Sequence, residues 1–316
     1  LLIAAKTPNQ RFNLVHRLSE KLSSDGESVF LSSQTFGDGT PPEDGWRRLS
    51  SFVWEDGPCW LYQADSVQVY TVENRSNAPC TLRVTPVFQF SQKGDPPQAP
   101  FPLHYTGGTI QGAGLTLHVK SSEPLLPLPQ TWENLSYEDD RKDGRRETGL
   151  GLTCAAVELT VPQGESRRLE LVFSTEPSGK GGAEILLDAQ ARQRSLLAQS
   201  GFKDPAAREL ARSADAFIAN RPSSGGKTIL AGYPFFGDWG RDTMIALPGC
   251  VLATKQYETA KSILRTFLAY EQDGLVPNLF PEGQEEPRYN TVDAALLLIN
   301  CVWLYYQKTD DRDFVR

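Results

Sequence analysis

The short segment Ser178-Gly179-Lys180-Gly181-Gly182 marks the point at which the periodicity of this 316-residue chain changes. Before it, apolar and polar residues alternate, which is typical of half-buried strands. After it, from Glu184 onward, apolar residues recur three and four positions apart, as they do in amphipathic helices. We therefore expect a strand-rich N-terminal domain over residues 1–177. Linker helices and a helical domain should follow over residues 178–316.

Two pairs of strand-like segments in the first half indicate hairpins. Residues 67–72 (VQVYTV) are followed, after a turn-forming stretch, by residues 82–84 (LRV), and residues 157–161 are followed by 169–173 across a Pro-Gln-Gly-Glu turn. Several such segments, with no helical period between them, favour an antiparallel β-sandwich over a parallel α/β sheet.

Three helical segments stand out in the second half. Asp204 is a suitable N-cap, with Pro205 at the first helical position. The apolar stripe of that helix would comprise Ala207, Leu210, Ala211, Ala214, Phe217 and Ile218. A second helix is expected over 257–272. A third, over 292–307, is apolar on nearly every side, which predicts an inner helix surrounded by other helices.

Composition excludes several classes of function. The chain carries 32 Lys and Arg against 39 Asp and Glu, a net charge of −7, and no basic run, so nucleic acid is not an expected partner. No apolar run reaches the ~18 residues that span a bilayer, so no membrane anchor is expected. Because the chain begins with Leu1 and shows no signal peptide, it is expected to start inside its gene.

Metal and triad chemistry are also disfavoured. Five cysteines lie far apart with no C-x-x-C pair, which indicates reduced thiols and a cytoplasmic location rather than disulfides or zinc. All three histidines (His16, His104 and His118) fall in the strand-rich half without a metal-ligand spacing. A nucleophilic triad in the helical half would therefore lack its histidine.

The most unusual stretch is 231–243, AGYPFFGDWGRDT, which concentrates aromatics, glycines, two aspartates and an arginine between helices. Sugars offer apolar faces to aromatic rings and hydroxyl groups to carboxylates and guanidinium groups, so this stretch suits sugar binding. A structural alternative has equal weight at this point. In it, Trp239 anchors the core, and Arg241 and Asp242 form a local ion pair that caps a helix starting at Thr243.

A second stretch has the same chemistry at the next junction between helices. It comprises residues 277–282 (PNLFPE) and 288–293 (RYNTVD). Loops at successive helix junctions can converge at one end of a helical barrel, where a ligand would bind. The structural alternative is that Asn290 and Asp293 simply cap the helix 292–307.

Taken together, AGYPFFGDWGRDTMIALPG, DGLVPNLFPEG and RYNTVDA resemble the amylo-α-1,6-glucosidase domain of glycogen debranching enzymes, in the form found in bacteria and archaea. The strand-rich half resembles the β-sandwich domain that precedes it. The resemblance implies that the helical half is the first part of a six-hairpin (α/α)6 toroid. It also implies that the chain is truncated at both ends.

The resemblance carries site residues with it. It assigns Trp239, Arg241 and Asp242 to binding of the glucose beside the scissile bond, and Tyr289, Asn290 and Asp293 to the same subsite. It implies no metal and no cofactor. Hydrolysis with inversion needs an acid and a base ~6.5–9.5 Å apart. The resemblance implies that both follow the equivalent of Arg316, so the catalytic residues stay unknown and residues 1–316 alone are expected to be inactive.

Two positions depart from the family, which often has Trp where this chain has Phe235 and Leu297. The expected function is hydrolysis of α-1,6-glucosidic branch points in glycogen-like α-glucan. Two alternatives stay open: another six-hairpin glycosidase, trehalase-like or glucosidase-like, that acts on a smaller sugar, and a non-catalytic carbohydrate-binding protein.

Overall fold

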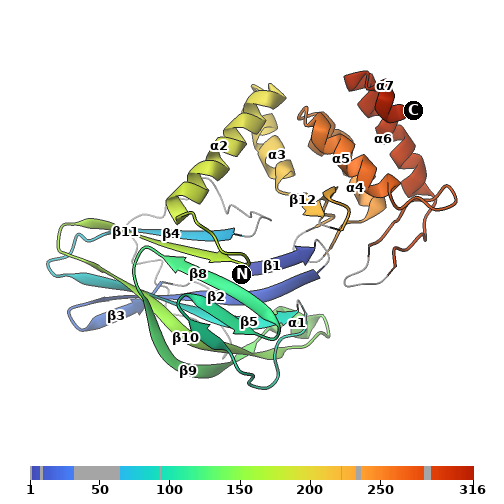
Figure 1. Cartoon of the computed structure of the whole chain (residues 1–316). Helices are drawn as coiled ribbons and strands as arrows, with labels where there is room; N and C mark the ends of the chain where they lie inside the picture. Colours follow the sequence, from blue (N-terminus) through green and yellow to red (C-terminus); the bar gives the residue numbers. More distant parts are fainter. Residues whose placement is uncertain are drawn as a thin grey trace. The chain divides into compact units, whose positions relative to one another are not determined.

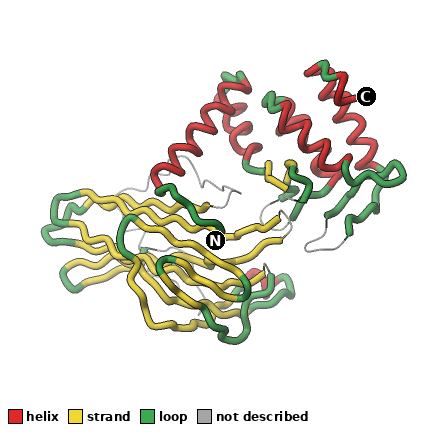
Figure 2. Tube along the Cα trace, viewed as in Figure 1, coloured by secondary structure: helices red, strands yellow, loops and turns green. Residues whose placement is uncertain are grey.

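A computed structural model describes residues 2–7, 10–31, 65–92, 94–221, 223–232, 236–280 and 286–316 (Figure 1). The chain forms two compact units. One takes up most of residues 12–187 and is built from strands, and the other takes up most of 188–316 and is mainly helical (Figure 2). The described part of the chain is therefore a mixed β and α structure.

The strand-rich unit contains two antiparallel sheets. The first has the order β1-β2-β5-β10-β9, with β3 paired to β2, and its strands are β1 (Leu2–Thr7), β2 (Gln10–Ser24), β3 (Glu27–Phe30), β5 (Cys80–Gln92), β9 (Leu125–Ser136) and β10 (Thr148–Val161). The second has the order β4-β11-β8-β7-β6, with β4 (Asp65–Glu73), β6 (His104–Thr106), β7 (Thr109–Gly112), β8 (Leu115–Ser121) and β11 (Ser166–Ser174). A short helix, α1 (Glu138–Lys142), follows β9.

Both sheets contribute to one hydrophobic core. Leu82 and Val84 of β5 and Leu169 and Leu171 of β11 are each at most 1% exposed, and they belong to one cluster of buried residues. The burial of β5 alternates along its first half, as period two requires when one face of a strand packs inward. The alternation of apolar and polar residues in the sequence thus arises because strands of both sheets pack against one core.

The two expected hairpins are wrong in their pairing, although their strands are present. β4 pairs with β11 in one sheet, while β5 pairs with β2 and β10 in the other, so the segment between β4 and β5 crosses from sheet to sheet. The turn between β10 and β11 crosses in the same way. Alternation fixes only which side chains face inward, and strands of both sheets face the same core. A short connection therefore fits either arrangement.

Asn74 holds these two crossings together. It is 4% exposed, and its Nδ2 donates to the carbonyl oxygens of Ala78, at 2.8 Å, and Val161, at 2.9 Å. Its backbone N–H donates to Glu165 O, and its carbonyl accepts from Gly164 N, each at 2.9 Å. The residue is therefore a structural link between the two corners.

The helical unit contains α3 (Pro205–Asp215), α4 (Gly240–Leu247), α5 (Tyr257–Leu268), α6 (Asp293–Thr309) and α7 (Arg312–Val315), and α2 (Gly182–Ser200) leads into it. A hairpin of β12 (Ile218–Arg221) and β13 (Gly226–Ile229) lies between α3 and α4. A π-helical turn, Pro248–Leu252, extends α4. The buried core of this unit is made by α4, α5 and α6, through side chains such as Met244, Ile263 and Leu298.

The helix boundaries confirm part of what the sequence predicts. Asp204 caps α3 by accepting from Ala207 N at 3.0 Å, with Pro205 in the first turn, as expected. However, α3 ends at Asp215, and Leu210 is 71% exposed, so the expected stripe to Ile218 is wrong. The chain instead turns into β12, because Ile218 pairs with Ile229 across the hairpin.

The two later helices also differ from expectation. α5 ends at Leu268, four residues short of the expected 272, and Gln272 then pairs with Leu275 in a tight turn. In α6 one face is buried, but Leu296, Ile299 and Trp303 are 54–64% exposed. Among the described residues, α6 is therefore packed on one side only, whereas its apolar sequence predicts a helix surrounded by other helices.

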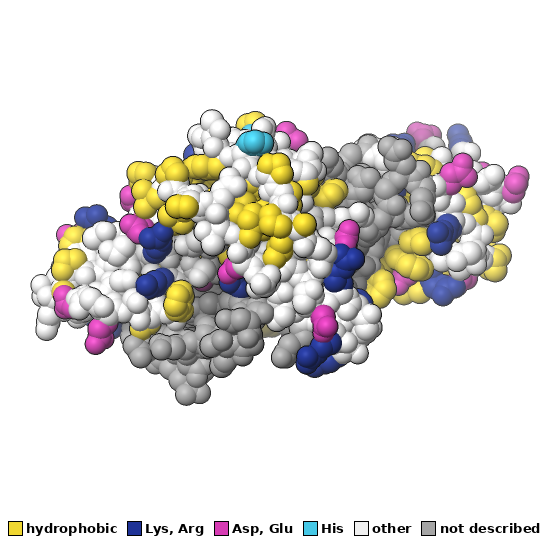
Figure 3. All heavy atoms as spheres, turned by 90° about the horizontal axis from the view of Figure 1, so that it is seen from below, with side chains coloured by type: hydrophobic (Ala, Val, Ile, Leu, Met, Phe, Trp, Pro, Cys, Tyr) yellow, Lys and Arg dark blue, Asp and Glu magenta, His cyan; other side chains and the backbone are white. Residues whose placement is uncertain are grey.

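The surface is mixed in charge, and the described thiols are free. Basic and acidic side chains are interspersed over the face shown in Figure 3. Among the described cysteines, Cys80, Cys154 and Cys301 are buried free thiols and Cys250 is partly buried; Cys59 lies outside the described residues. Within the described chain, no helix is both long and apolar enough to cross a bilayer.

Candidate sugar-binding site

The stretch around Trp239 packs directly against the second predicted stretch. Gly240 begins α4, and its backbone N–H donates to Asn278 O at 2.9 Å. A Cβ at position 240 would lie 2.1 Å from Pro277 O, so only glycine permits this approach. Trp239 and Leu279 form a backbone bridge beside it. The contacting residues, such as Gly240 and Pro277, are 37 or more positions apart in sequence, so the two stretches form one surface.

Asn278 joins three loop segments, namely the turn at Arg241 and the two parts of the second stretch, 277–282 and 288–293. Its side chain is 4% exposed and accepts from Arg241 N at 3.4 Å, while its Nδ2 donates to Asn290 Oδ1 at 3.1 Å. Its backbone N–H also donates to Arg288 O at 2.9 Å. Asn278 lies within the motif PNLFPE, but the sequence pattern assigns it no role. The only sign of its role in the sequence is that a polar residue stands between Pro277 and Leu279.

The charged groups of the site come from different helices. Arg241 Nε lies 2.6 Å from Asp293 Oδ2, and the two side chains are 48% and 43% exposed. Desolvation opposes ionisation of Asp293, but the ion pair with Arg241 outweighs this and lowers the pKa of the carboxyl. Asp293 is therefore a carboxylate at neutral pH.

The expected alternative of a local Arg241–Asp242 pair is wrong, since Arg241 pairs with Asp293 at the first residue of α6. The helix expected to start at Thr243 starts at Gly240 instead, because the backbone of 240 is anchored on Asn278. Asp242 lies in the first turn of α4 and is exposed, where the positive end of the helix dipole favours a carboxylate.

The capping alternative for Asn290 is also wrong. α6 begins at Asp293 with Val292 as its N-cap, and no side chain caps it. Asn290 instead accepts from Asn278, so it belongs to the loop cluster. Tyr289 is half-buried, and its hydroxyl donates to Tyr270 O at 2.6 Å. Desolvation and nearby acidic groups raise the pKa of Tyr289, which therefore stays a neutral donor.

The residues assigned by resemblance therefore gather on one loop cluster. Trp239 is half-buried, Arg241 and Asp242 are exposed, and Tyr289, Asn290 and Asp293 adjoin them through Asn278 and the ion pair. Phe235, one of the two departures from the family, lies outside the described residues. Leu297 is half-buried and packs against the helical core.

Comparisons with known proteins cover both units. Residues 1–168 match the family described as the N terminal part of glycogen debranching enzyme, and residues 212–316 match the family described as amylo-alpha-1,6-glucosidase. A glycogen debranching enzyme of Saccharomyces cerevisiae is 36% identical over 89 residues, which is 27% of this chain and 6% of the yeast protein.

A solved structure also overlaps the chain. It is described as a candidate kojibiose phosphorylase from the human microbiome, with a TM-score of 0.41 and 10% identity over 98% of this chain and 49% of that one. The chain thus spans about half the length of this structure and a small part of the yeast enzyme.

Proposed function

Because the chain belongs to the glycogen debranching enzyme family, we propose that it is part of a glycoside hydrolase that releases glucose from α-1,6 branch points of glycogen-like α-glucan. The proposal includes a domain boundary near residue 178, a β-sandwich before it and the first part of a six-hairpin toroid after it. It also keeps the bacterial or archaeal form of the family, an inverting mechanism and a cytoplasmic location. Nucleic acid, membranes and cofactors have no part in it.

The observation that carries the proposal is the ion pair between Arg241 and Asp293. It joins the stretch 231–243 to the start of α6, and both side chains remain about half exposed. Each can therefore exchange part of its pairing for hydroxyl groups of a sugar. Guanidinium and carboxylate groups grip vicinal hydroxyls with two hydrogen bonds each. Trp239, on the same turn, supports the sugar's apolar face.

Asp293 suits binding better than proton donation. A general acid must hold its proton at the working pH, and the lowered pKa of Asp293 keeps it ionised. We therefore assign Trp239, Arg241, Asp242, Tyr289, Asn290 and Asp293 to substrate binding. The acid and base of the inverting step are proposed to lie outside residues 1–316, so this chain by itself should bind sugar without turnover.

The test is Arg241→Ala in the complete gene product, with glucose release from a branched limit dextrin as the measurement. Losing a charge-assisted hydrogen bond to substrate should lower kcat/KM by about 10- to 100-fold. Arg312→Ala is the control, because Arg312 also pairs with an aspartate, Asp310, but is 67% exposed on α7. It should leave kcat/KM unchanged.

Three results would count against the proposal. Normal kinetics of Arg241→Ala would remove the site assignment. Activity on a disaccharide without activity on glycogen would favour a glycosidase for smaller sugars. Binding of glucan with no hydrolysis by the complete gene product would favour a non-catalytic binding protein.

A further inference from the structure

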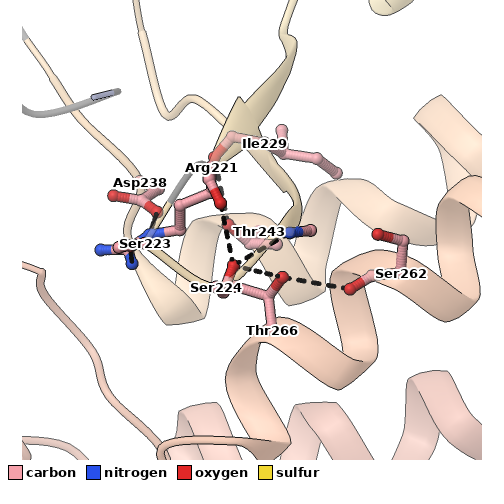
Figure 4. Close-up of polar contacts among 9 residues, drawn as sticks. Arg221, Ser223, Ser224, Ile229, Asp238, Thr243, Ser262 and Thr266 are labelled. Atoms are coloured by element: carbon pink, nitrogen blue, oxygen red, sulfur yellow. Dashed lines mark hydrogen bonds and ion pairs between the residues drawn. The ribbon is translucent and has the colours of Figure 1, made fainter. Parts of the chain in front are cut away.

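Arg221 is a buried arginine that no sequence motif singled out. It ends β12, and its side chain is 9% exposed. Its Nε lies 2.8 Å from Oδ2 of Asp238, whose side chain is fully buried. Its Nη1 donates to Ser223 Oγ, as Figure 4 shows. Asp238 immediately precedes Trp239, so one end of the Arg221 guanidinium is tied to the first predicted sugar-binding stretch.

The flat face of the same guanidinium contacts the second stretch. Its central carbon lies 3.8 Å from the ring centroid of Phe280 and 5.7 Å from that of Tyr270. Phe280 follows Asn278 by two residues, and Tyr270 O accepts the hydroxyl of Tyr289. Arg221 therefore touches both loops that carry the predicted sugar ligands, while remaining buried itself.

The hairpin that presents Arg221 is fixed to α5. Ser224 Oγ lies 3.2 Å from Thr266 Oγ1 (Figure 4). Lys227 N also donates to Ser262 Oγ at 3.1 Å. A Cβ at Gly226 would lie 2.5 Å from Thr266 Oγ1, so the hairpin sits close to the helix. Arg221 is thus held from a rigid element.

We propose that Arg221 is a positioning residue: it fixes the turn 238–241 against the turn 277–280, so that Trp239 and Arg241 face one sugar. The inference rests on the proposed function for its enzymatic consequence. It requires an arginine, because a planar guanidinium can donate to Asp238 and Ser223 while stacking on Phe280. The ammonium of lysine is a compact point charge with no flat face to stack on the ring while it donates to Asp238 and Ser223.

Lys261 of α5 offers a matched control, because its aspartate partner follows the C-terminal end of α6, away from the predicted sugar-binding loops. Lys261 Nζ lies 2.6 Å from Asp311 Oδ2 and 5.5 Å from the ring centroid of Phe314. It is therefore also a partly buried cation with an aspartate and an aromatic partner. Lys261→Arg perturbs a pair of the same kind without touching either predicted loop.

The first experiment measures hydrogen exchange in the complete gene product. The amides of Gly240 and Arg241 donate to Asn278, so they report how the two turns are held. In Arg221→Lys both should exchange at least about 10-fold faster, while the amides of α5 keep their rates. In Lys261→Arg neither should change. Unchanged exchange at 240 and 241 in Arg221→Lys would overturn the inference whatever the enzyme does.

The second experiment measures kinetics on the branched limit dextrin. Arg221→Lys should lower kcat/KM by about 10-fold, mainly through KM, and Lys261→Arg should leave KM unchanged. In an Arg241→Ala background, Arg221→Lys should lower kcat/KM less than about 2-fold further, because both changes act on one turn. Full additivity would contradict positioning, since a general loss of stability adds to any other defect.

The outcomes separate the two proposals. Faster exchange at 240 and 241 in a gene product that hydrolyses no glucan would support positioning and refute the proposed function. Normal exchange and a normal KM of Arg221→Lys in an enzyme that releases glucose would refute positioning and support the proposed function. If Arg221→Lys does not fold, Phe280→Leu replaces it, because it removes the stacked ring and keeps the ion pair, and the same results are expected.

Discussion

Gly240 is the residue at which the two predicted sugar-binding stretches come closest. Its φ is ordinary, so the requirement for glycine comes from space and not from backbone conformation. The carbonyl of Pro277 occupies the position that any Cβ would take. In the W-G-R-D motif, Trp239, Arg241 and Asp242 are therefore predicted sugar ligands, whereas Gly240 is required for packing.

We expect Gly240→Ala to destabilise the helical unit by about 1–3 kcal/mol, because the methyl group must displace backbone atoms of residue 277. Urea unfolding measures the change. Gly249→Ala is the control: it lies in the π-helical turn with no atom within 4 Å of its added Cβ. That substitution should be neutral, or stabilising by up to about 1 kcal/mol, since alanine favours helix. Equal losses for both would contradict the steric explanation.

At the scale of elements, the sequence locates strands but does not pair them. Residues 67–72 and 157–161 are strands as predicted, yet each is followed by a crossing to the other sheet. The pairing depends on backbone groups that meet only in the folded unit. The hairpin β12–β13 differs, because the sequence predicts a helix where β12 begins: Phe217 and Ile218 continue the helical spacing of α3.

The corner residue Asn74 tests the crossing. We expect Asn74→Asp to lower the free energy of unfolding by about 2–4 kcal/mol, because it replaces an amide that donates two buried hydrogen bonds with a carboxylate that faces two carbonyl oxygens. Asn134→Asp, at an exposed position of β9, should change it by less than about 0.5 kcal/mol. Chemical denaturation measures both. An Asn74→Asp protein as stable as the parent would show that the corner does not depend on this side chain.

On the scale of the whole molecule, the described residues form two separate cores, one between sheets and one among α4, α5 and α6. The two family matches largely follow the same division: most of residues 1–168 belong to the strand-rich unit, and residues 212–316 belong to the helical unit. Stability therefore has contributions that belong to each unit. The pH dependence of the strand-rich unit has an identifiable source in His16.

Burial, with the nearby charge of Arg17, lowers the pKa of His16 to about 4, and the ring packs edge-on against Tyr137. In the unfolded chain histidine titrates near 6.5. Between these pH values the unfolded state binds more protons, so stability falls as the pH decreases. We expect a loss on the order of 2–3 kcal/mol from pH 6.5 to pH 4 that His16→Gln abolishes, measured by urea unfolding across that range. The same pH dependence in His16→Gln and the parent would assign it to other groups.

The sequence by itself determined the change from strands to helices near residue 180, the inward-facing side chains of most strands, the cap of α3 and the family. These follow from local periodicity, from a single capping side chain and from motifs that are contiguous in the chain. It also gathered the polar and aromatic residues of the candidate site into two short stretches.

Only the tertiary structure decided how those parts meet. It paired Arg241 with Asp293 instead of Asp242, made Asn278 the link among three loops, and placed buried Arg221 between Asp238 and Phe280. The physical reason is that ion pairs, stacking and close backbone approaches depend on distances in space. The residues that make these contacts are 12 or more positions apart in the sequence, and local sequence patterns do not predict which of them come together.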